Sequence, residues 1–391
     1  MTHMASHGLI VLMLLAGLAP GPVAADESGA RPAEAAEGVA AAWSPAPAST
    51  LTQEEFPLPR HDPRPLMQAL IERKQPTATT PFTFVAASDW HGRGTDLFGL
   101  FQRLNPDFAL TMGDLADIGF GSRGLAEYRK LEQAAGDFFR TCPTWSAPGN
   151  HEVGKAKWTA EERAEARRRF SAYFGQPHDD VFSFTYANAK FIGLPFEFYE
   201  GDGLLKRLEE ELASAEGRHI FVFSHHAYYT GLWRPKNPVL DAATELFKKY
   251  KVVAVLGGGT HVYYRQRKDG VTYILNGTGG MLGQLPGNRD HPTLRNALPD
   301  DAWFGRNPDG SGGSHFIHPK LEKPIQVKGR KTFAVAITVE GPSVTMRLVD
   351  IEGKQWDTAT LAGPAKQEAV PGETETNAPA PAEAPAATAA P

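Results

Sequence analysis

The sequence predicts an α/β protein in which two β-sheets pack on each other and helices flank them. Between residues 82 and 256, short apolar runs typical of strands alternate with amphipathic runs typical of helices. After residue 260 the pattern consists mainly of strands, which indicates a second sheet packed on the first. A hydrophobic content of 41% is enough to supply the buried core that this arrangement requires.

The folded region is predicted to span residues 52–362 as a single domain. Residues 26–51 and 363–391 are rich in Ala, Pro and Glu, so we expect a linker and a disordered tail there. Residues 281–330 are rich in Gly, Pro, Asn and His, which predicts a long loop or lid.

Residues 1–25 are expected to be an export signal. An apolar run from Gly8 to Leu18 precedes the small residues Val23, Ala24 and Ala25, which suit signal peptidase. At ~1.5 Å per residue the run is too short to cross a ~30 Å bilayer core. No Lys or Arg precedes the run, so an uncleaved interfacial anchor or a misassigned start remain as alternatives. The expected location is periplasmic or secreted, and no later stretch suggests a transmembrane span.

The individual elements follow from local patterns in chain order. An apolar run predicts the first strand at 82–87, and leucines and phenylalanines at helical spacing predict a helix at 95–104. The same two patterns predict strands at 108–112, 144–147, 182–186, 190–194, 219–223 and 252–256, and helices at 123–139, 159–174, 203–214 and 239–250. The closing strands are predicted at 261–267, 271–275, 331–339 and 343–350.

Five of the predicted strands are each followed by a cluster of carboxylate, amide or imidazole side chains. The clusters are Asp89-Trp90-His91, Gly113-Asp114, Gly149-Asn150-His151-Glu152, His225-His226 and His261. Open α/β sheets bind ligands at the carboxyl ends of their strands, so five strand ends of one sheet can meet in one cleft. Divalent cations take this mixture of oxygen and nitrogen donors. Taken singly, each cluster could be a turn, a helix cap or a buried histidine pair; their joint placement favours a metal site.

The order and spacing of these clusters resemble the calcineurin-like metallophosphoesterase superfamily over roughly residues 80–350. The resemblance implies a four-layer architecture and two divalent ions such as Mn, Fe or Zn. The ligands it implies are Asp89, His91 and His261 for the first metal, Asp114 as the bridge, and Asn150 and His225 for the second metal.

The resemblance also implies hydrolysis of phosphate mono- or diesters, in which a metal-bound hydroxide attacks phosphorus in line. His151 would then assist the leaving group and, with Asn150, contact the substrate. Either Asp114 or Glu152 could orient His151. We expect Arg265 to contact the substrate phosphate, with an arginine on a strand face as the alternative.

Two positions depart from the family pattern. Gly259 stands where the family commonly has a histidine that serves the second metal, so we expect a weakened second site that His226, His315 or His318 could complete. Asp117 stands where purple acid phosphatases have a tyrosine ligand, so the coloured tyrosinate–iron centre is not expected.

Other classes find little support in the sequence. A net charge of −5 without a basic block argues against a nucleic-acid partner. The zincin, nucleotide-binding P-loop and nucleophile-elbow motifs are absent. The remaining alternative is a non-catalytic protein that binds a phosphorylated ligand or partner on a degenerate, single-metal phosphatase scaffold, and Gly259 keeps this hypothesis open.

Overall fold

The computed structural model describes most of the region predicted to fold. The described residues are 43–44, 51–93, 95–196, 198, 202–226, 228–229, 237–279, 302–306, 314–318, 320, 323, 325–327 and 332–362. The expected export signal (1–25), the expected tail (363–391) and most of the expected linker (26–51) lie outside them. No helix in the described part of the chain is long and apolar enough to cross a bilayer.

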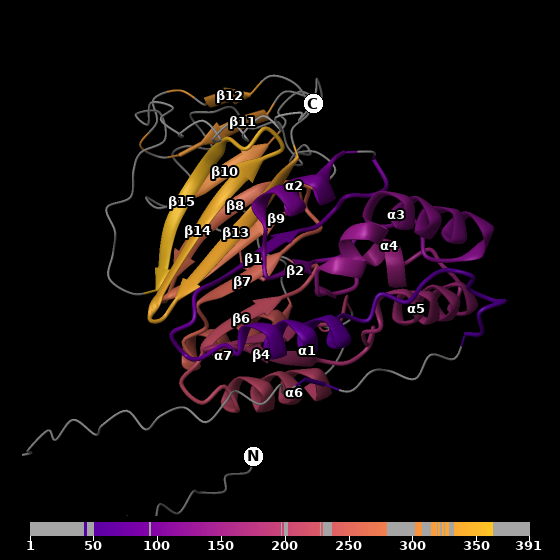
Figure 1. Ribbon diagram of the computed structural model, residues 1–391, viewed down its shortest axis with the longest axis horizontal. Coiled ribbons are helices and arrows are strands. Elements are labelled where there is room, and N and C mark those ends of the chain that lie inside the picture. Colours follow the sequence, from indigo (N-terminus) through magenta and orange to yellow (C-terminus); the bar gives the residue numbers. More distant parts are fainter. Residues whose placement is uncertain are drawn as a thin grey trace, which may run out of the picture. The chain divides into compact units, whose positions relative to one another are not determined.

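Two sheets form the centre of the fold, as the sequence predicted (Figure 1). The first sheet has the order β15-β14-β13-β1-β2-β3. Its strands are β1 (Phe82–Ala87), β2 (Phe108–Thr111), β3 (Thr144–Ser146), β13 (Phe333–Glu340), β14 (Ser343–Asp350) and β15 (Gln355–Ala362). Strands β1, β2 and β3 are parallel, and β13 joins β1 in antiparallel register with Phe84 opposite Ile337.

The second sheet has the order β12-β11-β10-β8-β9-β7-β6-β5-β4. Its strands are β4 (Phe182–Tyr186), β5 (Ala189–Gly193), β6 (His219–Phe223), β7 (Ala254–Gly257), β8 (Tyr263–Lys268), β9 (Val271–Asn276), β10 (Trp303–Arg306), β11 (Ser314–Ile317) and β12 (Ile325–Val327). Strands β5, β6, β7 and β9 are parallel to their neighbours in that series. The carboxyl ends of β6 and β7 therefore lie at the same edge of this sheet.

Helices cover the outer face of each sheet. The helices of the described chain are α1 (Pro63–Lys74), α2 (Leu97–Leu104), α3 (Gly121–Thr141), α4 (Asn150–Val153), α5 (Ala160–Phe174), α6 (Asp202–Ala213) and α7 (Pro238–Lys249). Of these, α1 packs through Met67 and Leu70 on the core between the sheets, and α4 is a single turn in the loop after β3. Residues of α2, α3 and α5 pack with the β1 side chains Val85 and Ala87, and residues of α6 and α7 pack with Val222 of β6. The result is the four-layer order of helices, sheet, sheet and helices.

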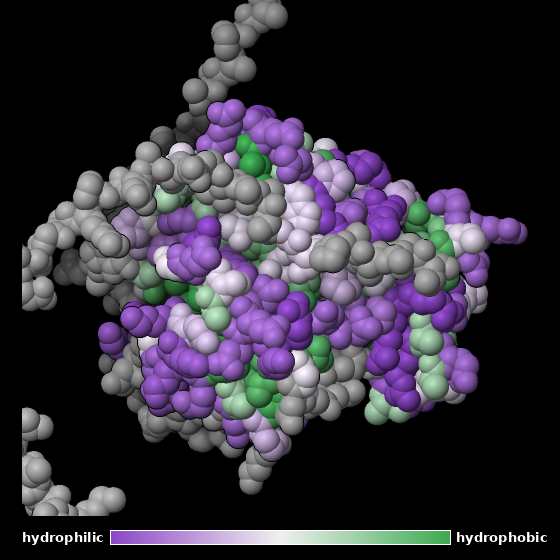
Figure 2. All heavy atoms as spheres, turned by 90° about the horizontal axis from the view of Figure 1, so that it is seen from below, coloured by the Kyte–Doolittle hydropathy of each residue, from purple (hydrophilic) through white to green (hydrophobic). Residues whose placement is uncertain are grey.

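The core between the sheets is built from alternate residues of the strands. Phe84 and Phe108 of the first sheet meet Phe191 and Phe221 of the second, with ring centroids 5.1 Å apart in the Phe84–Phe191 and Phe84–Phe221 pairs. Side chains alternate between faces along a strand, so Val85 points to the helices while Phe84 points to the other sheet. The face of the molecule in Figure 2 is mainly hydrophilic, with small separate hydrophobic patches.

The strands after residue 260 correct one expectation. They do not form a separate second sheet: β13, β14 and β15 extend the first sheet, while β8 to β12 extend the second. In Figure 1 the C-terminal β13, in orange to yellow, lies beside the N-terminal β1, and β14 follows on its other side. Strand pairing over such sequence separations depends on partner strands that the local pattern does not identify.

The structure also corrects the prediction of a long loop or lid at 281–330, because part of this segment forms strands. Strands β10, β11 and β12 extend the edge of the second sheet through antiparallel pairing, with Phe304 opposite Tyr264 of β8. These strands have only three or four residues, too few for alternation to be recognised among the surrounding Gly and Pro residues. The prediction also missed α1, α4 and β15.

Part of the segment predicted to be a linker packs on the fold, and the cysteine is buried. Trp43, inside the segment expected to be a linker, forms an isolated antiparallel bridge with Phe184 and packs against the core between the sheets. Cys142, the one cysteine of the sequence, is buried, and burial raises the pKa of its thiol to about 12. The thiol is therefore protonated and unreactive at neutral pH.

A buried histidine fastens the segment before α1 to the helices. His61 Nε2 lies 2.6 Å from Glu132 Oε2 on α3, and the Tyr173 hydroxyl on α5 donates to the same oxygen at 3.0 Å. Burial lowers the pKa of His61, although Glu132 opposes the shift. The structure therefore favours a neutral imidazole that donates Nε2–H to a carboxylate.

The His61 contact predicts a pH-dependent contribution to stability. Because the pKa of His61 is lower in the folded than in the unfolded state, the unfolded chain takes up the proton first as the pH falls below about 6.5. The contribution of His61 is therefore complete above that pH and is lost below it, by up to about 1.4 kcal/mol per pH unit. Urea denaturation of wild type and His61→Asn at pH 7.5, 6.5 and 5.5 should show their free energies of unfolding converging. A constant difference would contradict the assignment.

Candidate metal centre

The predicted site residues come together where strand ends of both sheets meet. Asp89, Asp114 and Asn150 follow β1, β2 and β3 of the first sheet, whereas His225 and His261 follow β6 and β7 of the second. The expectation that one sheet supplies all five strand ends is therefore wrong. The two sheets are stacked, so equivalent edges meet and the cleft lies between them.

Backbone conformation at the site is unusual. Asp89, His91, Asp114 and His261 all have positive φ, between 51° and 61°. Such values are uncommon outside glycine, and in folded proteins they concentrate at functional sites. The sharp reversal after each strand turns these side chains into the cleft.

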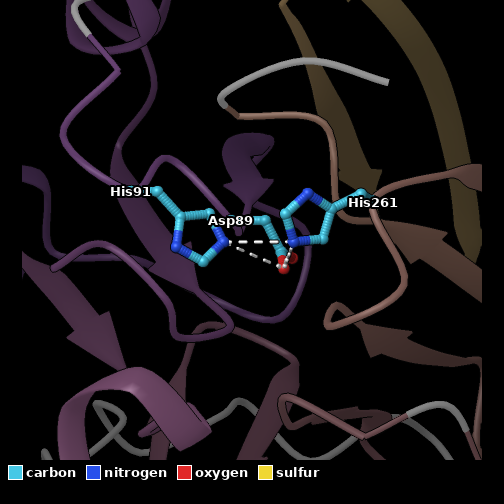
Figure 3. A group of neighbouring side chains, drawn as sticks. All are labelled: Asp89, His91 and His261. Carbon is cyan, nitrogen blue, oxygen red and sulfur yellow. Dashed lines mark hydrogen bonds and ion pairs between the residues drawn. The ribbon is translucent and has the colours of Figure 1, made fainter. Parts of the chain in front are cut away.

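One group of ligand atoms consists of Asp89, His91 and His261. Their side chains point toward one another (Figure 3). The Nε2 atoms of His91 and His261 are 3.1 Å apart, and His261 Nε2 lies 3.2 Å from Asp89 Oδ1. His91 Nε2 lies 3.8 Å from the same oxygen. Three donor atoms thus face one position.

A second group is arranged around Asp114, Asn150 and His225. His225 Nε2 lies 3.2 Å from Asp114 Oδ2 and 3.1 Å from Asn150 Oδ1. The same Asp114 oxygen lies 3.7 Å from His91 Nε2 in the first group. Asp114 therefore stands between the two groups, in the place that the sequence assigned to a bridging carboxylate.

Backbone groups fix the orientation of these ligands. His225 Nδ1 donates to the carbonyl oxygen of Met112 at 2.7 Å, which leaves Nε2 free to bind a cation. Asp89 Oδ2 accepts the Gly259 N–H at 2.8 Å and the Ser88 hydroxyl. The ligand atoms are thus held in place by the loops of both sheets.

Glu152 ties the Asn150 loop to the Asp114 loop. It is buried, and its carboxylate accepts the backbone N–H groups of Asp114 at 2.8 Å, Ala116 at 2.9 Å and Gly149 at 3.0 Å. Burial and the nearby Asp114 carboxylate raise the pKa of Glu152 to about 7. Glu152 therefore positions the loops and does not orient the His151 ring.

Asp117 orients His151, a role that the sequence left open between Asp114 and Glu152. His151 Nδ1 donates to the Asp117 carbonyl oxygen at 2.6 Å and lies 3.1 Å from the Asp117 carboxylate. His151 Nε2 is thereby directed to the cleft, 3.9 Å from Asp114 Oδ2. The same Asp117 carboxylate oxygen lies 3.4 Å from His91 Nδ1. His91, Asp117 and His151 also form a group with the spacing of metal ligands.

The charges of the site favour cations. Burial alone would raise the pKa values of Asp89 and Asp114, but the neighbouring imidazoles, chiefly His91 for Asp89 and His225 for Asp114, outweigh it and lower both. Burial would lower the pKa of His225, yet the Asp114 and Asp89 carboxylates raise it to about 10. A metal ion must displace that proton, so metal binding should release protons.

The donor set fits a pair of divalent cations. Asp89 Oδ1 is buried and accepts no hydrogen bond from the described residues, although it faces two imidazole Nε2 atoms. Burying a carboxylate oxygen without a hydrogen-bond donor costs free energy unless a cation binds that oxygen. Asp89, His91, His261 and Asp114 would hold one ion, and Asp114, Asn150 and His225 the other.

Gly259 faces the second group, as the family pattern implied. A Cβ built on Gly259 would lie 3.1 Å from His225 Nε2 and 3.0 Å from the His225 carbonyl oxygen. The φ of Gly259 is +77°, which strains any other residue. A side chain here would therefore point at the second group, and the present backbone has no room for one.

Of the histidines suggested as replacements, neither His226 nor His318 is placed in a ligand group. His226 Nε2 donates to the Phe196 carbonyl oxygen, and burial lowers its pKa to about 4. His318 Nδ1 accepts the Lys320 N–H at 3.1 Å. His315 pairs through its backbone within the second sheet, and its side chain lies outside the described part of the structure.

The expectation that Arg265 contacts substrate phosphate is not supported. Its side chain is buried and forms a two-pronged ion pair with Asp357 of β15, at 2.6 and 3.0 Å. Tyr263 donates to the same carboxylate. Side chains alternate along β8, so Arg265 shares the face of Tyr263 and points into the core between the sheets.

Sequence reasoning missed the roles of Asp117, Glu152 and the Met112 carbonyl. For Asp117, its spacing of three residues from Asp114 was visible but was interpreted only as a missing tyrosine. For Glu152, the Gly-Asn-His-Glu run places an acid where it can accept the N–H of its own turn, as in a capping box. No sequence signal identifies a backbone carbonyl partner.

The family model described as calcineurin-like phosphoesterase matches residues 82–263. No curated protein sequence matches the chain significantly. Similar solved structures include GAP50, the anchor in the inner membrane complex of Plasmodium, at 13% identity and a TM-score of 0.46, covering 73% of this chain and 90% of that one. Another is a dimetal phosphatase from Danio rerio, at 12% identity and a TM-score of 0.38, covering 63% and 98%.

Proposed function

Because residues 82–263 belong to the calcineurin-like phosphoesterase family, we propose that this protein is an exported, metal-dependent hydrolase of phosphate mono- or diesters. The observation that carries the proposal is the position of Asp114 Oδ2, 3.2 Å from His225 Nε2 and 3.7 Å from His91 Nε2, between two groups of ligands. Export rests on the apolar run before Ala25.

The roles of the residues follow from their positions. When bound, two divalent cations lower the pKa of a water molecule toward ~7 and offset the charge of the phosphoryl oxygens. Asn150 belongs to the second group and His151 Nε2 lies 3.9 Å from its Asp114 carboxylate, so the phosphate of a substrate bound there would contact both. Nε2 of His151 would donate a proton to the departing alkoxide, and the Asp117 carboxylate would stabilise the imidazolium that this requires.

A hydrolysis assay tests the proposal. Wild type reconstituted with Mn²⁺, Zn²⁺ or Fe²⁺ should cleave a chromogenic phosphate monoester or diester. His151→Ala should lower kcat by about 10²- to 10⁴-fold, the usual contribution of an acid–base group. Metal content measured by elemental analysis should not change in this variant. Turnover no faster than that of His151→Ala with every metal would refute the enzyme hypothesis.

The two cations should differ in affinity. The second group offers three protein ligands, because Gly259 provides no side chain, and we expect its ion to dissociate at least ~10-fold more readily than the first. Gly259→Ala should weaken the second ion further, since the added Cβ would press on His225. Titration with Mn²⁺ followed by calorimetry measures both. Two equal sites in wild type would contradict the prediction.

Gly259 also sustains the alternative of a single-metal protein that binds a phosphorylated ligand without turnover. Elemental analysis and phosphate binding separate the two functions. A single tightly held ion with phosphate binding but no hydrolysis would favour the binding protein, whereas hydrolysis that depends on the second ion would favour the enzyme.

A further inference from the structure

We propose that Lys155 binds the phosphoryl group of the substrate. The inference rests on the proposed function and extends it to a residue outside the recognised clusters. Arg265, the side chain expected to bind the phosphate, is instead paired with Asp357 in the core, so the phosphate needs another cationic partner. A phosphate held between two metals still presents charged oxygens, which a protein cation commonly binds.

The backbone of Lys155 is fixed next to the site. The residue follows α4, which carries Asn150 and His151, and the Gly154 N–H closes that helix on the Asn150 carbonyl at 3.2 Å. The Lys155 carbonyl accepts the Trp158 N–H at 2.9 Å and an Arg163 N–H at 3.3 Å. Trp158 is buried, so this turn is anchored and its lysine is held four positions beyond His151.

The side chain of Lys155 is partly buried without a partner. Among the lysines that the structure describes, only Lys155 and Lys190 are not exposed. The Lys190 ammonium group lies 2.7 Å from the Glu211 carboxylate and donates a hydrogen bond to the Ser214 hydroxyl. Lys155 makes no ion pair or side-chain hydrogen bond with any described residue. Partial burial of an ammonium group without an acceptor is unfavourable, so the observation points to an anion supplied from outside the chain.

The charged groups that act on Lys155 include carboxylates of the site. Burial lowers the pKa of Lys155, while the carboxylates of Asp114 and Asp117 oppose the shift. Burial lowers the pKa of His151, and the charge of Lys155 adds to that shift. Bound cations would neutralise Asp114 and repel Lys155, and an incoming phosphate would relieve that repulsion.

Binding of inorganic phosphate to the metal-loaded protein tests the inference. Lys155→Met keeps the aliphatic stem and removes the charge. We expect it to weaken phosphate binding, measured by calorimetry, by about 10- to 100-fold, as for loss of a charged hydrogen bond. Lys155→Arg should stay within about 3-fold of wild type. The exposed Lys157, two residues away, provides a control of equal net charge, and Lys157→Met should bind phosphate like wild type.

Further readouts separate binding from a structural role. With Mn²⁺ alone, Lys155→Met should hold its ions at least as well as wild type, because a repelling charge is gone. In the ester assay it should raise KM more than it lowers kcat. Equal phosphate affinity in Lys155→Met and Lys157→Met would overturn the assignment of Lys155 alone. Failure of loaded wild type either to bind phosphate or to cleave esters would instead overturn the proposed function, and the role of Lys155 with it.

Discussion

Asp114→Asn is expected to abolish tight binding of both cations and to lower kcat/KM by about 10⁴-fold or more. Asp114 Oδ2 is the oxygen that faces both ligand groups, and the substitution replaces one of its oxygens by an NH₂ group and removes its charge. Loss of metal removes several kcal/mol of transition-state stabilisation, and each 1.36 kcal/mol is about tenfold in rate. Elemental analysis and the ester assay measure the two effects.

The Asp114 variant should still fold, so its loss of activity can be interpreted. Asparagine tolerates the positive φ of 56° at this position, and its amide oxygen can still accept the His151 N–H, which lies 2.9 Å from Asp114 Oδ1. Asp269→Asn is the matched control, because Asp269 has a φ of 52° in an exposed turn. Retention of two tightly bound ions in Asp114→Asn would exclude the bridging role.

The sequence predicted which candidate ligands come together because of a simple physical regularity. Each ligand follows an apolar strand directly, and polar residues at that point can lie only at a sheet edge or in a turn. The geometry brings Asp89, His91, Asp114, Asn150, His225 and His261 together, and it places His151 beside them. Chain order alone could not assign these strand ends to two sheets, because strand pairing is decided by contacts between distant segments.

The errors concern side-chain direction. Arg265 follows His261 by four residues, which suggests a substrate ligand. The two-residue alternation of β8 instead points the Arg265 side chain into the core. There it pairs with Asp357 of β15, a strand that the sequence did not predict. Lys155 and Asp117 show the reverse case. Both are ordinary charged residues in a loop. Only the folded chain reveals that Lys155 pairs with none of the described side chains and that Asp117 lies between two histidines.

Glu152 should make the largest contribution to stability among the side chains around the site. Its Oε2 accepts two buried N–H groups and its Oε1 accepts a third. Glu152→Leu leaves all three donors unsatisfied, so we expect the free energy of unfolding of the metal-free protein to fall by about 3–5 kcal/mol. Glu152→Gln keeps one oxygen, which can still accept from Asp114 and Gly149, and it should cost about 1–3 kcal/mol.

Glu152→Leu should also weaken metal binding, because the three N–H donors belong to the loops that carry Asp114 and Asn150. Once Glu152 no longer holds these loops together, the second ion should be lost first, since fewer protein ligands hold it. Urea denaturation in EDTA gives the stability, and Mn²⁺ titration gives the affinity. Glu162→Gln is the control, because Glu162 accepts one N–H in the exposed capping box of α5, where glutamine serves as well. If Glu152→Leu unfolds at the same urea concentration as this control, the three hydrogen bonds do not hold the loops in place.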